Sequence, residues 1–145
     1  MEAVVDELEL RRLAHAYASA VDRRDVSRLL DLFVPDGRLT VVRGREESEE
    51  YRGHAEIPGL FDVLGECDTT MHEVVNHHLE LDGEGATGEV SCVAHHVTRR
   101  PGADANDLVM YVRYCDAYAR YRDRWRFACR RLVVGWTELR RVRLP

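Results

Sequence analysis

Residues 108–138 read LVMYVRYCDAYARYRDRWRFACRRLVVGWTE, and this stretch decides the fold. It contains two runs rich in valine, tyrosine, phenylalanine and tryptophan, 108–122 and 125–138, with a short turn between them. This composition is typical of β-strands, and so short a connection joins neighbouring antiparallel strands. Both runs are much longer than the usual five or six residues of a strand, so we expect a sheet that coils or bends strongly.

The same pattern continues upstream of this stretch. Residues 71–81 and 86–99 have the composition of two further long strands. The segments that separate the strands, 82–85 and 101–106, contain glycine and are short enough to be hairpin turns. The second half of the chain is therefore expected to form one antiparallel meander.

The first part of the chain has a helical pattern instead. Asp25 has the character of an N-cap for a short second helix that extends to Phe33, and Pro35-Asp36-Gly37 should end that helix and turn the chain. Before it, an amphipathic helix is expected over about residues 5–23, because apolar residues recur there at a spacing of three and four: Leu10, Leu13, Ala14, Tyr17, Ala18 and Val21.

Three elements are expected between these helices and the meander. Residues 39–42 favour a short strand, and the polar run 43–52 favours a solvated loop that could serve as a lid. Apolar residues at helical spacing, including Leu60 and Phe61, predict a third helix over about residues 55–66.

Helices followed by a run of strands indicate an α+β domain and not alternating α/β units. Helices that lie across the concave side of a strongly bent sheet enclose a cone, whose narrow end packs shut and whose wide end can remain open. A chain of 145 residues is the size of one domain, so we expect a single cone-shaped α+β barrel over residues 1–145, with one pocket for a small, largely apolar molecule.

Composition narrows the classes of partner. The formal net charge of −5 makes nucleic-acid binding an unfavourable interpretation, because phosphates require a positive surface. The apolar runs are too short to span a membrane, and no secretory leader is recognisable at the start of the sequence. The four cysteines are widely spaced without a metal-binding or disulfide pattern. We expect a cytoplasmic protein.

Three segments form a combination that a known family shares: Tyr17-x4-Asp22-x2-Asp25, His72-x3-Asn76 followed by Leu81-Asp82-Gly83, and Arg113-Tyr114-x-Asp116 continuing to Trp136. In these segments the sequence resembles the NTF2-like superfamily and, within it, the SnoaL-like group near scytalone dehydratase, bile-acid dehydratase, ketosteroid isomerase and polyketide cyclases. The resemblance implies the cone-shaped fold on a mixed or antiparallel sheet, a homodimer, and activity without a metal or other cofactor. It does not choose a reaction, since the superfamily also includes proteins that only bind.

The resemblance implies a catalytic group at three of these positions. In dehydratase-like members an aspartate at the end of the first helix meets a histidine at the start of a central strand, which here are Asp22 and His72. An imidazole can accept and return a proton near neutral pH, and a carboxylate behind it fixes its tautomer. Tyr17 has the offset of a tyrosine whose hydroxyl could stabilise an enolate oxygen, although it also lies in the apolar stripe of the first helix.

Further candidates to line the pocket follow from strand alternation. By plain alternation Asn76 and His78 share the face of His72, unless a bulge inverts the order. One residue of each of two pairs should also face the pocket: His95 or His96, and Tyr111 or Tyr114.

Apolar residues of the predicted helices, Phe33, Leu60 and Phe61, complete the expected lining of the pocket. Asp116 is a rival catalytic base, with a cross-strand ion pair to an arginine as the alternative interpretation.

These residues favour a cofactor-independent enzyme that removes a proton α to a carbonyl of a cyclic or polyketide-like compound, and so catalyses dehydration, isomerisation or cyclisation. Dehydration is preferred because one histidine can serve as both base and acid. The alternative is a non-catalytic module that binds a small molecule or a partner protein.

Overall fold

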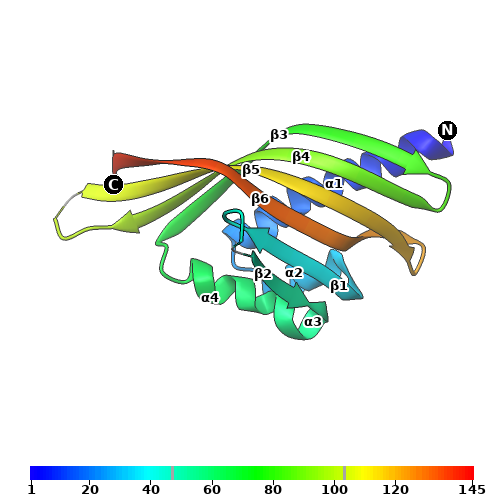
Figure 1. Ribbon diagram of the computed structural model, residues 1–145, viewed down its shortest axis with the longest axis horizontal. Coiled ribbons are helices and arrows are strands. Elements are labelled where there is room, and N and C mark those ends of the chain that lie inside the picture. Colours follow the sequence, from blue (N-terminus) through cyan, green and yellow to red (C-terminus); the bar gives the residue numbers. More distant parts are fainter. Residues whose placement is uncertain (47, 103) are drawn as a thin grey trace.

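The computed structural model describes residues 1–46, 48–102 and 104–145. In these residues six strands form one sheet in the order β2-β1-β6-β5-β4-β3, and Figure 1 shows α1 crossing one face of it. The elements are α1 (Glu2–Asp22), α2 (Val26–Asp31), β1 (Phe33–Val42), β2 (Ser48–Arg52), α3 (Gly53–Glu56), η1 (Ile57–Gly59), α4 (Leu60–Leu64), β3 (Thr69–Asp82), β4 (Gly85–Arg99), β5 (Asp104–Tyr121) and β6 (Arg124–Arg143).

The expected α+β class is confirmed. β3 to β6 are 14, 15, 18 and 20 residues long and pair antiparallel in sequence order, as the meander predicts. β1 joins the other edge of β6 in parallel, so the sheet is mixed. The long strands twist and bend, and α2 and α3 lie beside β1 and β2 (Figure 1).

The N-terminal helix packs its apolar stripe against the sheet. Leu10, Ala14, Tyr17 and Val21 are almost completely buried, in one core with Phe127 of β6. This stripe fixes the rotation of α1 about its axis, so that Asp22 at its last turn lies beside the first residues of β3.

Phe33 does not continue the second helix. α2 ends at Asp31, and Phe33 starts β1 opposite Phe127. Its ring packs 5.2 Å from the ring of Phe127 and 6.4 Å from that of Tyr17. The expected turn at residues 35–37 falls instead on the irregular part of the β1–β6 pairing, so burial of Phe33 between the helix and the sheet overrides its helical spacing.

The predicted loop over 43–52 is shorter than expected. Residues 48–52 form the edge strand β2, whose charged side chains suit an edge that faces water. The predicted third helix is broken into α3, η1 and α4, with Pro58 inside the 3-10 turn.

Candidate active site

The last turn of α1 and the start of β3 bring Asp22 and His72 into direct contact. His72 Nδ1 lies 2.7 Å from Asp22 Oδ1, and the His72 backbone N–H donates to Oδ2 at 2.9 Å. The His72 side chain is only 7% exposed. Because a carboxylate accepts and does not donate, the short contact requires a proton on Nδ1, so Nε2 is the proton acceptor in the neutral form of the ring.

Asp22 is held in its ionised form. Burial alone would raise its pKa, but hydrogen bonds from the side chain and backbone of His72 and from Thr70 outweigh burial and lower it. Thr70 Oγ1 donates to Asp22 Oδ1 at 3.0 Å. The carboxylate therefore remains negative over the range in which an imidazole titrates.

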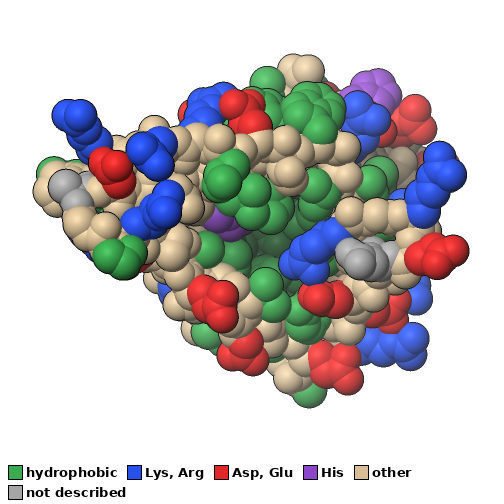
Figure 2. All heavy atoms as spheres, turned by 60° about the vertical axis from the view of Figure 1, so that its left-hand side comes forward, with side chains coloured by type: hydrophobic (Ala, Val, Ile, Leu, Met, Phe, Trp, Pro, Cys, Tyr) green, Lys and Arg blue, Asp and Glu red, His purple; other side chains and the backbone are tan. Residues whose placement is uncertain are grey.

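A hollow on the concave side of the sheet lies on the other side of His72. Its cavity volume is about 50 Å³, which is smaller than the roughly 300–1,000 Å³ of most small-molecule sites. Figure 2 shows hydrophobic side chains around the mouth and a histidine within it. His72 lines this hollow and Asp22 does not, so the carboxylate supports the imidazole from behind. The apolar lining comes from Val21, Val41, Leu60, Val63, Leu64, Ala94, Met110, Val112, Leu132 and Val134.

Two tyrosines form part of the same wall. Tyr17 and Tyr114 are each 2% exposed, and their rings meet edge to face at 5.7 Å. Burial raises the pKa of Tyr17 to about 12 and raises that of Tyr114 well above its usual value. Both phenols therefore keep their protons at neutral pH and remain donors. Among the described residues, the Tyr114 hydroxyl has no hydrogen-bond partner.

Arg130 lies beneath these two rings. Its guanidinium carbon is 4.3 Å from the ring centre of Tyr17 and 3.8 Å from that of Tyr114, close enough for cation–π attraction. Arg130 donates to both carboxylate oxygens of Asp116, at 2.9 and 3.1 Å, and both side chains are buried. Asp116 does not line the hollow, and it makes the cross-strand ion pair with an arginine that was the alternative interpretation of this residue.

His96, and not His95, is the histidine of β4 that faces the hollow. Its ring meets that of His72 edge to face at 5.8 Å, and burial lowers its pKa, so it is neutral near pH 7. His96 Nδ1 contacts the carbonyl oxygen of Leu108 at 3.1 Å and must donate to it. The remaining nitrogen is therefore an acceptor, so neutral His96 offers the hollow no N–H donor.

His95 lies on the opposite face of the sheet. Its Nδ1 is 2.6 Å from Asp107 and its Nε2 is 3.3 Å from Glu73. Hydrogen bonding to Asp107 chiefly raises its pKa. Of the two candidates in β4, His96 therefore faces the hollow and His95 faces the other side of the sheet.

A bulge in β3 overturns the interpretation of Asn76 and His78. The pairing with β4 shifts by one residue between Val74 and His77, so Asn76 and His78 face solvent and His77 turns inward. The His78 side chain is 77% exposed. His77 Nε2 instead lies 3.2 Å from the Tyr118 hydroxyl, below the hollow.

The other expected lining residues divide in the same way. Tyr111 is on the outer face, stacked on Trp136 at 4.7 Å, whereas Tyr114 faces the hollow. Leu60 lines it, but Phe33 is in the core and Phe61 borders a separate surface depression beside Asp22. Phe61 turns away because the break at Pro58 changes the phase of α4 relative to one continuous helix.

Sequence reasoning did not identify most of the apolar wall. Met110, Val112, Leu132 and Val134 alternate along β5 and β6 at a spacing of two, which was the available signal. Arg43 at the mouth was assigned to a solvated loop and could not be placed.

Neither a metal site nor a membrane-spanning helix is found in the part of the chain that the structure describes. In residues 1–46, 48–102 and 104–145 there is no group of three or more His, Cys, Asp or Glu side chains that could hold a metal ion. Within the same residues, no helix is long and apolar enough to cross a membrane.

A bent sheet with a supported histidine in an apolar hollow is the architecture of the NTF2-like superfamily. The SnoaL-like domain family matches residues 2–131, so the chain belongs to that family. Uncharacterized proteins of Mycobacterium bovis and Mycobacterium tuberculosis are each 28% identical to it over 135 residues, which is 85% of this chain and 81% of theirs.

Solved structures share the fold at lower identity. A hexachlorocyclohexane dehydrochlorinase, LinA type 3 of Novosphingobium barchaimii, matches with a TM-score of 0.81 at 17% identity, over 94% of this chain and 91% of that one. A scytalone dehydratase-like protein of Novosphingobium aromaticivorans matches with a TM-score of 0.77 at 21% identity, over 97% and 91%. At these identities the likeness establishes the fold and not the reaction.

Proposed function

We propose that this protein is a cofactor-independent enzyme that removes a proton α to a carbonyl in a small cyclic or polyketide-like compound, with loss of water as the favoured outcome. The observation that carries the proposal is the position of His72, with one nitrogen fixed by Asp22 and its ring in the wall of an apolar hollow. Fold neighbours that are dehydratase-like or dehydrochlorinases support the same kind of elimination.

His72 serves as base and then as acid. Nε2 takes the α proton as the C–H bond breaks, and the imidazolium that forms is stabilised by the Asp22 carboxylate 2.7 Å from Nδ1. The electron pair moves onto the carbonyl oxygen as an enolate. Its collapse expels a hydroxyl group from the β carbon, the imidazolium returns the proton to that group, and the products are water and a conjugated carbonyl.

The enolate oxygen requires donors that keep their protons. Tyr17 and Tyr114 meet this requirement, since burial raises the pKa of both hydroxyls. Arg130 stacks beneath both rings and places a positive charge behind them. The apolar residues of the wall exclude water, which strengthens these interactions and selects an apolar ring system as substrate.

Proton abstraction can be tested without the natural substrate. Cyclic ketones and β-hydroxy ketones in D2O exchange their α protons when a base removes them, and nuclear magnetic resonance follows this exchange. We expect exchange above the buffer rate, and a fall of about 10²–10⁴-fold in His72→Ala and Asp22→Asn. His78→Ala is the matched control, because that histidine is on the same strand and exposed.

Two results would decide against the enzyme. Unchanged exchange in His72→Ala would exclude this histidine as the base. Equal binding of the ketones to wild type and both variants, with exchange in none, would favour the non-catalytic binding module, since the hollow would then hold a ligand without chemistry.

A further inference from the structure

Arg24 closes the C-terminal end of α1: its backbone N–H donates to the Val21 carbonyl at 3.1 Å, and the N–H of Asp25 donates to the Ala20 carbonyl at 2.9 Å. It follows the last turn of α1 with φ of 55°, in the left-handed region that glycine occupies most easily at helix ends. This left-handed conformation belongs to the helix cap, and the side chain of Arg24 makes separate contacts.

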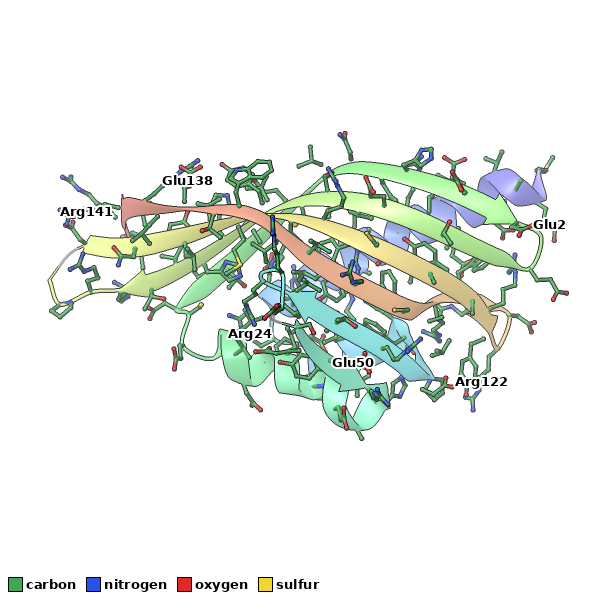
Figure 3. The ribbon with its side chains drawn as sticks, in the orientation of Figure 1. Glu2, Arg24, Glu50, Arg122, Glu138 and Arg141 are labelled. Atoms are coloured by element: carbon green, nitrogen blue, oxygen red, sulfur yellow. The ribbon has the colours of Figure 1, made fainter. Side chains whose placement is uncertain are left out.

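The guanidinium of Arg24 joins three elements around the Asp22–His72 pair. NH1 donates to the Val21 carbonyl at 2.7 Å and to Thr70 Oγ1 at 2.8 Å, and NH2 donates to the Leu64 carbonyl at 3.3 Å. These acceptors belong to α1, β3 and α4 respectively. In Figure 3 Arg24 lies between α4 and the sheet.

The direction of the hydrogen bonds is fixed by chemistry. A guanidinium can only donate, so the Thr70 oxygen accepts from Arg24 and must give its single proton to Asp22 Oδ1, 3.0 Å away. The same Oδ1 accepts from His72 Nδ1. Thr70 is 6% exposed, so water does not readily replace its hydroxyl.

We propose that Arg24 and Thr70 are positioning residues that hold Asp22 in the rotamer that orients His72, and that Arg24 also fixes the end of α4 against this pair. The second role follows from Leu60, Val63 and Leu64, which line the hollow from α4. The inference rests on the proposed function for its effect on rate, but the orientation of His72 is a property of the free protein and is measured without substrate.

The roles of Thr70 and Arg24 can be distinguished by their effects on kcat and KM. Thr70→Val removes the hydroxyl and keeps the shape, so we expect kcat for ketone exchange to fall about 10-fold with KM within twofold of wild type, and Thr70→Ser to restore kcat. Arg24→Met also releases Leu64, so we expect both a lower kcat and a KM raised at least threefold. Arg23→Met is the matched control, because Arg23 is the preceding residue and its side chain is exposed.

Nitrogen-15 spectra of the histidine rings provide the readout that a merely structural role would not change. We expect His72 to be protonated on Nδ1 alone in wild type and Thr70→Ser, and to show a mixture of tautomers in Thr70→Val and Arg24→Met. Wild-type tautomer and kinetics in both of these variants would overturn the inference. Full exchange activity in His72→Ala would instead refute the proposed function, and the spectra would still decide whether Arg24 and Thr70 hold the pair.

Discussion

Replacing Asp116 by asparagine tests whether its carboxylate is structural. The side chains of Asp116 and Arg130 are 0% and 1% exposed, and the two make a pair of hydrogen bonds. The variant keeps the volume of the side chain and leaves the guanidinium charge without a counter-ion. Breaking a buried ion pair from one side costs about 3–5 kcal/mol, because the remaining charge has lost its solvation.

A chain of this size loses roughly 2–4 °C of melting temperature per kcal/mol, so Asp116→Asn should melt roughly 6–20 °C below wild type. Differential scanning calorimetry and urea unfolding measure this loss. Asp31→Asn is the control: Asp31 pairs with Arg126 at 3.1 Å but is 61% exposed, so its loss should cost at most about 1 kcal/mol.

Ketone exchange by the folded fraction distinguishes stability from chemistry. If Asp116 only neutralises Arg130, Asp116→Asn should retain exchange within a few-fold of wild type below its melting temperature. A variant that melts like wild type but has lost exchange would refute this reasoning and make Asp116 the base.

Three further predictions follow from buried or exposed groups. Burial, Arg11 and Arg130 lower the pKa of His77 from 6.5 to about 4, so between these pH values the unfolded chain binds a proton at His77 and the folded chain does not. The free energy of unfolding should therefore fall as pH drops from 6.5 towards 4. Urea unfolding of His77→Gln at several pH values should show a smaller fall. Tyr114→Phe removes a buried hydroxyl that lacks a partner among the described residues, so the protein should be about 1 kcal/mol more stable by urea unfolding yet slower in exchange, and equal exchange would exclude this hydroxyl as a donor. Trp136 is 65% exposed on the outer face of the sheet, and Met71 and Val75 are exposed as well. We expect a homodimer to form through this face, so Trp136→Arg should reduce the mass in sedimentation velocity to that of one chain. A wild-type protein that is already monomeric would contradict the expectation.

The long strands were predictable because their signal is local. Valine and aromatic residues separated by glycine-containing turns specify β3 to β6 regardless of what packs on them. The parallel addition of β1 to β6 was not predictable, since it depends on Phe33 meeting Phe127 across a large sequence separation. Propensity and spacing do not report such contacts.

The contact between Asp22 and His72 was anticipated from resemblance and spacing. The rest of the site depended on which face of its strand each side chain points to. One extra residue in β3 between Val74 and His77 exchanges the faces of everything that follows. Alternation from His72 therefore placed Asn76 and His78 in the pocket when they face solvent. Nothing in the local sequence marks the position of this bulge.

Asp22 and Asp116 are both buried or half-buried carboxylates, and they differ in the side chain that each one contacts. Each carboxylate accepts a pair of hydrogen bonds from one residue, Asp22 from His72 and Asp116 from Arg130. An arginine never gives up its proton near neutral pH, so Asp116 can only neutralise a charge. A histidine can gain and lose a proton in that range, so a carboxylate beside its ring can orient it and stabilise the imidazolium that forms when it acts as a base. The catalytic role proposed for Asp22 and the structural role expected of Asp116 differ because of the side chain that each carboxylate contacts.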